Sequence, residues 1–198
     1  MRFAAGQSAL IALWFGFVFI GADWLTAHRT GRVHIHIAAE LRIPLVPGFL
    51  LVYISIYLLF LGVPFVLRTR REIGSLALAQ FITILVAGVG FLLIPGTLAY
   101  GPPPDLGGWA PLFHLADRLN LDYDLVPSLH VAMSVVCIEA FARHAGAGGR
   151  AALRSWGLAI AASTVLTHQH HLLDAVAGYA LGIAVAGLTW RARSPSVG

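Results

Sequence analysis

The amino-acid sequence predicts an all-α integral membrane protein, built as a polytopic bundle of six transmembrane helices. Hydrophobic residues make up 58% of the 198-residue chain and charged residues only 11%, whereas soluble domains carry about 25% charged residues. Mean hydropathy is +0.80. Several apolar runs also approach the length of about 20 residues that an α-helix needs to cross a bilayer.

Six apolar runs follow one another along the chain, and we expect each to form a membrane-spanning helix. The first resembles a signal peptide, but it is long and no small-residue cleavage site follows it, so we expect it to be retained. No repeat or linker divides the sequence, which predicts a single membrane domain over residues 1–198. The runs are Ser8 to Leu25, Leu45 to Leu67, Leu76 to Tyr100, Leu129 to Ala142, Leu153 to Thr167 and Leu172 to Trp190.

Arginine and histidine are distributed differently between the two sides of this predicted bundle. With six spans and the N-terminus inside, nine of the 13 basic residues, all arginines, fall in inner segments and four in outer segments. Cytoplasmic segments are enriched in Arg and Lys, so both termini are predicted to be cytoplasmic. Eight of the nine histidines fall outside, the exception being His144. We therefore expect an active site at the extracytoplasmic end of a protein in the bacterial inner or plasma membrane, and no nucleic-acid partner.

Two outer segments carry further predictions. The segment 26–43 mixes charged side chains and histidines with apolar residues, which is typical of an amphipathic helix at the membrane interface. Its alternation from Val33 to Ile37 also fits a strand, but a lone strand at a membrane surface would leave its edges unpaired. The outer loop 101–126 is long enough to act as a lid or a binding loop.

Within the predicted spans, three features indicate structural roles. Gly178 and Gly182 have the small-xxx-small spacing that lets neighbouring helices approach closely. Glu139 has Arg143 four residues further on, which favours an ion pair within one helix. The single cysteine, Cys137, rules out an intrachain disulfide and is expected to be a small buried hydrophobic residue.

The stretch from Ser163 to Asp174 holds three histidines and an aspartate at the end of an apolar run. Such groups are costly in a membrane and usually carry a role. If a new helix begins at Leu172, His170 and Asp174 lie one turn apart on one face. A carboxylate in that position binds one imidazole nitrogen and so fixes the tautomer and direction of the ring.

A second polar group, Pro127-Ser-Leu-His130, opens the fourth predicted span. Proline in the first turn of a helix sacrifices no hydrogen bond, and the free N–H groups there favour an anion. Ser128 would add a hydroxyl donor, and His130 could protonate a leaving oxygen. The alternative interpretation is that Pro127 and Ser128 only cap the helix.

Taken together, Pro127-Ser-Leu-His130 and Ser163-x6-His170-x3-Asp174 resemble the motifs of the type 2 phosphatidic acid phosphatase superfamily, in particular its inositolphosphotransferase-like branch of membrane lipid phosphatases and phosphotransferases. The resemblance extends over roughly residues 44–190. It implies that His170 attacks a phosphoryl group and becomes phosphohistidine, that Asp174 orients the ring, and that His130 acts as general acid and then as base. It implies a lipid phosphate within the bilayer as substrate, and neither a metal nor another cofactor.

The chain departs from this family at the positions that bind phosphate. An arginine usually follows the serine of the last motif, but Thr164 stands there, and the segment 95–104 lacks the basic residues of the first motif. Stabilising the charge of the phosphoryl group is often the largest catalytic contribution, so we expect other donors to replace this clamp, or a less charged substrate such as a phosphodiester or an isoprenoid monophosphate. The residues expected to contact the substrate are Ser128, Leu129, Thr164, His168, His171 and Arg118.

Several functions remain compatible with these features. A phosphohydrolase and a phosphotransferase differ only in whether water or an alcohol discharges the phosphohistidine. The missing clamp would also fit a noncatalytic lipid-binding protein on the same fold. A metal-dependent membrane enzyme would use the histidines of 168–171 with Asp174, although adjacent histidines on a helix point about 100° apart and make poor joint ligands.

Overall fold

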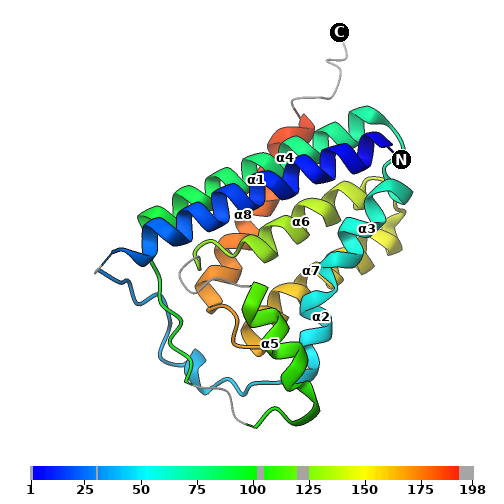
Figure 1. Cartoon of the computed structure of the whole chain (residues 1–198). Coiled ribbons are helices and arrows are strands. Elements are labelled where there is room, and N and C mark those ends of the chain that lie inside the picture. Colours follow the sequence, from blue (N-terminus) through cyan, green and yellow to red (C-terminus); the bar gives the residue numbers. More distant parts are fainter. Residues whose placement is uncertain (1, 30, 102–104, 120–124, 192–198) are drawn as a thin grey trace.

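The computed structural model describes residues 2–29, 31–101, 105–119 and 125–191, apart from the side chains of 117–119 and 191, and these residues form helices and loops without a β-strand (Figure 1). The all-α prediction is therefore confirmed for this part of the chain. Short 3-10 turns lie at Glu40–Arg42, Pro47–Phe49 and Gly107–Trp109. The α-helices are α1 (Arg2–Ala27), α2 (Leu50–Ile54), α3 (Ile56–Val66), α4 (Arg70–Leu93), α5 (Ala110–Leu119), α6 (Leu129–Ala142), α7 (Ala147–Leu166) and α8 (Leu172–Arg191).

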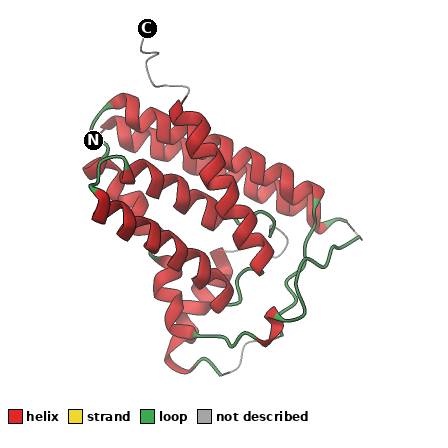
Figure 2. Ribbon diagram, turned by 180° about the vertical axis from the view of Figure 1, so that it is seen from behind, coloured by secondary structure: helices red, strands yellow, loops and turns green. Residues whose placement is uncertain are grey.

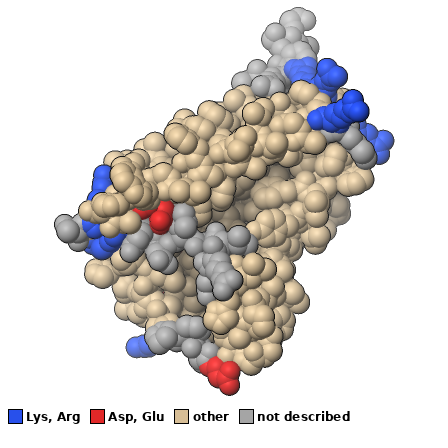
Figure 3. Space-filling model, in the orientation of Figure 1, with Lys and Arg blue, Asp and Glu red and all other residues tan. Residues whose placement is uncertain are grey.

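Among the described residues, four helical segments are long and apolar enough to cross a bilayer, namely Arg2–Ala27, Pro47–Val66, Arg70–Leu93 and Leu172–Trp190. On the face in Figure 3, acidic and basic side chains lie at the ends of the molecule, with a broad uncharged surface between them. A belt without charge is what contact with the hydrocarbon layer requires, since a charged side chain there is costly. These features indicate an integral membrane protein.

The helix α6 lies at the centre of the bundle. It packs against α3, α4, α7 and α8, and most of its side chains are buried. The helix α1 instead lies along α4 as an outer layer, and the N-terminal end of α1 and the C-terminal end of α8 lie at the same end of the molecule (Figure 1). The polar ends of α6 and α8 that carry the sequence motifs are therefore embedded among other helices.

Gly178 and Gly182 form a close helix contact, as predicted. A Cβ atom on Gly178 would collide with the carbonyl oxygen of Ser128, and one on Gly182 would lie 2.8 Å from the carbonyl oxygen of Ala132. Both positions therefore need glycine because the backbone of α6 occupies the space of a side chain. This contact fixes the start of α6 against the first turns of α8.

Glu139 pairs with a different arginine from the one predicted. Its carboxylate accepts two hydrogen bonds from Arg154 of α7, at 2.8 and 2.9 Å. Arg143 instead places its guanidinium over the ring of Trp190, 5.8 Å from the centroid. The i,i+4 rule failed here because a neighbouring helix offers a bidentate partner. Cys137 is fully buried, as expected.

The segment 26–43 is not an interfacial helix, apart from its start in α1 and the short turn at Glu40–Arg42. It is irregular and extended around Val33, whose N–H donates to the carbonyl of Pro95 at 2.9 Å. An isolated parallel bridge joins Val33 to Gly96. The predicted third span ends at Leu93 rather than Tyr100, and the residues after it supply this partner (Figure 2). The helix prediction was wrong because the partner for an extended segment comes from about 60 residues away and is invisible to local pattern.

Candidate active site

The turn between α7 and α8 carries the first candidate residues. The helix α7 ends in a Schellman motif, in which the N–H of Gln169 donates to the carbonyl of Thr164 at 2.9 Å and the N–H of His168 to Val165 at 3.0 Å. His168 takes the left-handed conformation that this motif requires, with φ 57°. The N–H of His170 donates to the same Thr164 carbonyl at 3.0 Å. The chain therefore reverses tightly and places His170 just before α8.

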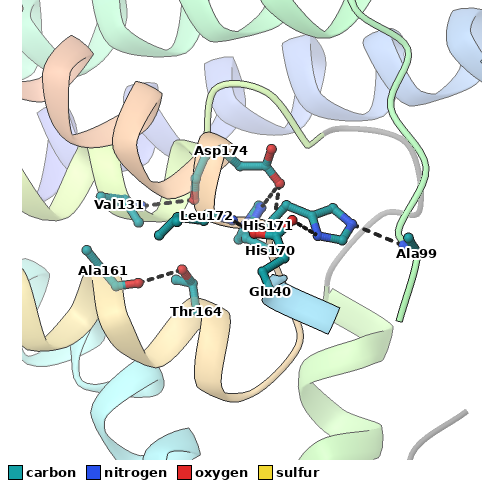
Figure 4. Close-up of polar contacts among 10 residues, drawn as sticks. Glu40, Ala99, Val131, Ala161, Thr164, His170, His171, Leu172 and Asp174 are labelled. Carbon is teal, nitrogen blue, oxygen red and sulfur yellow. Dashed lines mark hydrogen bonds and ion pairs between the residues drawn. The ribbon is translucent and has the colours of Figure 1, made fainter. Parts of the chain in front are cut away.

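The helix α8 begins at Leu172, as predicted, and Asp174 stabilises its start. Its Oδ2 accepts a hydrogen bond from the N–H of His171 at 2.9 Å, which is the second half of a capping box. The same oxygen lies 3.6 Å from Nδ1 of His170 (Figure 4). Asp174 is fully buried, whereas the His170 side chain is 11% exposed. With Nδ1 on the carboxylate side, Nε2 of His170 is the nitrogen left for a substrate.

A second buried carboxylate, Glu40, meets the same turn from the distant segment before α2. Its Oε2 accepts a hydrogen bond from the N–H of Leu172 at 2.7 Å, and its Oε1 accepts one from the N–H of Ile37 at 2.9 Å. Its Oε1 also lies 3.0 Å from Nδ1 of His171 (Figure 4). The N–H of Ala99 donates to Nε2 of His171 at 3.0 Å, so the neutral ring carries its proton on Nδ1, facing Glu40.

Tyr100 covers this cluster with its ring. It stacks on His168 at a centroid distance of 3.9 Å and on His171 at 4.8 Å. Burial, together with the charges of Glu40 and Asp174, raises the pKa of Tyr100 to about 12, so its hydroxyl stays protonated. The stack helps to hold the segment after α4 against the α7–α8 turn.

His130, the other histidine of the motifs, is held by α2. Its Nε2 lies 2.8 Å from the carbonyl oxygen of Tyr53, and its ring stacks on the Tyr53 ring at 3.9 Å. A carbonyl oxygen only accepts, so Nε2 carries a proton and Nδ1 is the nitrogen left for proton transfer. Pro127 lies before the helix rather than in its first turn, because α6 begins at Leu129 with Ser128 as its N-cap.

His130 and His170 line the same cavity of about 670 Å³. Side chains of α1, α3, α4 and α6 form its walls, and Leu112, Leu115 and Ala116 of α5 line it from the outer loop. The hollow is visible between these helices in Figure 3. The described lining contains no Arg or Lys. Its polar side chains are Gln7, Ser8, Tyr53, Tyr57, Gln80, His130, Gln169 and His170.

The other predicted contacts have different surroundings. Leu129 lines the cavity. Ser128 is fully buried and its hydroxyl caps α6 by accepting from the N–H of Val131 at 3.4 Å. The Thr164 hydroxyl donates to the carbonyl of Ala161 at 2.8 Å. These two side chains are not part of the cavity lining.

The rings of the other two histidines in this turn, His168 and His171, contact groups of the protein itself. A ring nitrogen of His168 lies 3.0 Å from the carbonyl oxygen of Ile43. His171 is fully buried between Glu40 and Ala99 and is not a surface residue. The side chain of Arg118 lies outside the described part of the chain.

Sequence reasoning missed Glu40 and Tyr53 as parts of this site. Glu40 is separated from Leu172 by 132 residues, and Tyr53 from His130 by 77. Neither contact leaves a periodic signal. The only signal for Glu40 in the sequence was an acidic residue within a mixed polar and apolar segment. Tyr53 lies in an apolar run, where a tyrosine is most simply interpreted as a packing residue.

We expect the protein to lose thermal stability as the pH falls below about 6.5, through His171. Burial lowers the pKa of His171 from its usual value near 6.5, although Asp174 and Glu40 oppose this effect. The unfolded chain therefore takes up a proton near pH 6.5 that the folded protein does not. The contribution of His171 to the free energy of unfolding is constant above that pH. Below it, this contribution decreases towards the folded-state pKa, by at most about 1.4 kcal/mol per pH unit for one group.

Thermal unfolding followed by tryptophan fluorescence in detergent, from pH 7.5 to 5.5, tests this prediction. The His171→Gln variant should show a shallower dependence of Tm on pH than the parent. His28→Gln, which changes an exposed histidine, should keep the parental slope. Parallel slopes for the parent and His171→Gln would contradict the assignment.

Comparisons of the chain with protein-family models, with curated proteins and with solved structures each found no match. The fold and the site therefore define its class by themselves. The protein is an α-helical integral membrane protein in which histidines from two separate helix starts line one largely apolar cavity.

Proposed function

We propose that the protein is a membrane-bound lipid-phosphate phosphohydrolase or phosphotransferase that works through a phosphohistidine on His170. The observation that carries this proposal is that His130 and His170 line one cavity whose other walls are mainly apolar. A lipid phosphate combines a polar reacting group with a long apolar chain. Along α1, the lining extends from Gln7 to Phe19, or about 18 Å, which is more than half of the hydrocarbon thickness of about 30 Å.

The proposed reaction has two displacements at phosphorus. Nε2 of His170 attacks the phosphorus atom, the bond from phosphorus to the leaving oxygen breaks, and protonated His130 gives that oxygen a proton from Nδ1. Water or an alcohol then attacks the phosphorus atom, the bond from phosphorus to Nε2 of His170 breaks, and Nδ1 of His130 takes the proton from the attacking oxygen. The carbonyl of Tyr53 supports this role because it holds Nε2–H of His130 throughout. Asp174 supports the positive charge that develops on His170.

The described lining of the cavity offers no Arg or Lys side chain as a phosphate clamp. Arg29 and Arg32 each donate to a backbone carbonyl, of Leu92 and Ala27 respectively. Arg118 belongs to α5, whose apolar residues line the cavity, so we propose it as the basic residue that reaches the phosphoryl group. A substrate with a single phosphate charge would reduce the need for this residue.

The proposed topology has six crossings, with α2 and α3 acting as one span and with α6 and α7 added to the four long helices. An even number of crossings agrees with the termini of α1 and α8 at the same end of the molecule. The helix α6 is short for a span, but it is surrounded by protein. The excess of arginine in the segments at that end favours cytoplasmic termini and an extracytoplasmic site in the bacterial inner or plasma membrane.

Two other functions make different predictions. A noncatalytic lipid-binding protein is favoured by the absence of Arg and Lys from the described cavity lining. A metal-dependent enzyme has less support, because the described residues form no group of three or more His, Cys, Asp or Glu side chains that could hold a metal ion. The rings of His168 and His171 are instead engaged by Ile43, Glu40 and Ala99.

Purified protein in detergent micelles tests the proposal. We expect it to release phosphate from at least one of phosphatidate, lysophosphatidate and isoprenyl phosphates, with the same rate in EDTA. Labelled lipid incubated with inositol or another alcohol separates transfer from hydrolysis. Binding of these lipids without turnover would favour the noncatalytic function, and loss of turnover in EDTA would favour the metal enzyme.

A further inference from the structure

The buried carboxylate of Glu40 is not explained by the two motifs. Glu40 is only 3% exposed, although it comes from an irregular segment outside the long helices. Its two oxygens contact the N–H of Ile37, Nδ1 of His171 and the N–H of Leu172. We call these three contacts the Glu40 clasp. Burying a carboxylate is costly unless it is well paired, so the clasp needs a physical reason.

Each group in the Glu40 clasp carries a hydrogen, and the two backbone N–H groups donate hydrogen bonds to the carboxylate, while Nδ1 of His171 lies 3.0 Å from Oε1. Ile37 and Leu172 offer backbone N–H groups, and His171 carries its proton on Nδ1 because Ala99 donates to its Nε2. An ionised carboxylate accepts at both oxygens, whereas an amide would turn its own NH2 donor towards one of these donors. A negative charge at the first turn of α8 is also favoured by the helix dipole. The position therefore selects glutamate rather than glutamine.

The Glu40 clasp acts on the backbone that carries His170. It holds His171 and Leu172, the two residues that follow His170, and Asp174 binds the N–H of His171 from inside the helix. The direct contact between His170 and Asp174 is long, at 3.6 Å. The direction of the His170 ring therefore depends on how the turn is held as well as on Asp174.

We propose that Glu40 is a positioning residue for His170, acting through the ring of His171 and the first N–H of α8. The kinetic part of this inference rests on the proposed phosphotransfer function. The structural part does not, because it concerns only the order of the α7–α8 turn. Glu40 does not line the cavity, so its loss should change the alignment of His170 and not the binding of the lipid chain.

The test is Glu40→Gln in the full-length protein. We expect kcat with the best lipid phosphate to fall by about 10- to 100-fold, because a misplaced nucleophile loses rate steeply, while KM changes less than about twofold. Hydrogen exchange should rise in peptides that contain residues 170–174. Glu40→Asp keeps the charge on a shorter side chain, so it should lose less kcat than Glu40→Gln, and it serves as the test if Glu40→Gln does not fold.

Glu72→Gln is the matched control. Glu72 also accepts backbone N–H groups at a helix start, from Thr69 and Arg68, but it lies at the beginning of α4 and is not among the residues that line the cavity. This variant should loosen the start of α4 and leave kcat unchanged. Parental kcat and unchanged exchange at 170–174 in Glu40→Gln would overturn the proposal. If the parent protein turns over no lipid phosphate, the proposed function fails, and the exchange at 170–174 alone decides whether the Glu40 clasp orders the turn.

Discussion

His170→Ala is expected to abolish turnover of lipid phosphates and to remove all acid-labile labelling of the protein by a phosphorus-labelled substrate. The variant lacks the nucleophile that forms the phosphohistidine, so kcat should fall by at least about 1,000-fold. Lipid binding should persist because the apolar walls of the cavity are unchanged. Phosphate release and the label retained on denatured protein are the two measurements.

The variant His130→Asn tests the role of His130 as proton donor independently of the role of His170 as nucleophile. Without a proton donor, the leaving oxygen departs slowly, and kcat should fall by about 100- to 10,000-fold. A substrate with a leaving group that needs no proton, such as a p-nitrophenyl phosphodiester or monoester, should recover labelling in His130→Asn and not in His170→Ala. His144→Ala changes a histidine that pairs with Glu72 outside the cavity and should match the parent. Full activity in His170→Ala would rule out the phosphohistidine mechanism.

Gly178→Ala is expected to destabilise the protein strongly for a change of one methyl group. The added Cβ would collide with the carbonyl oxygen of Ser128, and backbone atoms move less readily than a flexible side chain. Overpacking of this kind costs about 1–3 kcal/mol, occasionally more. Because the collision is at the start of α6, it should also displace His130 from His170 and lower kcat. Thermal unfolding in detergent and steady-state kinetics measure the two effects.

Gly187→Ala provides the control on the same helix. No atom of the described residues lies within 4 Å of a Cβ at Gly187, so we expect the change to add helix propensity without a collision. It should leave Tm unchanged or raise it, by an amount equivalent to up to about 1 kcal/mol. Equal Tm values for Gly178→Ala and Gly187→Ala would show that α6 and α8 are further apart than described here.

The helices were predictable because the hydrocarbon layer imposes long apolar runs on the sequence. The start of α8 at Leu172 followed from the apolar run there, and the spacing of Gly178 and Gly182 predicted a close helix contact without showing that α6 is the partner. The prediction of a helix over 26–43 was wrong because the local pattern does not show that this extended segment pairs with Gly96. Glu139 was assigned to Arg143 because local spacing cannot show that Arg154 lies closer.

The candidate site was predictable to the same degree. His170 and Asp174 are close in the chain, so helical periodicity brings them together. Tyr53 and Glu40 reach the site only through the fold, and no repeated spacing marks contacts across such distances. The two motifs therefore identify His130, His170 and Asp174 as the candidate site, while the contacts of Tyr53 and Glu40 become visible only in three dimensions.

The outer position of α1 has a consequence for how a substrate would arrive. Within the described residues, α1 packs along α4, and side chains of α1 line the cavity together with Tyr57 and Phe60 of α3. These helices belong to separate layers of the bundle, so on the proposed function we expect a lipid chain to enter between them from the bilayer and not from water. The rate of the proposed reaction is then governed by the mole fraction of substrate among the surrounding lipids. Diluting the substrate with inert lipid should slow the proposed reaction even when the total substrate in the sample is unchanged.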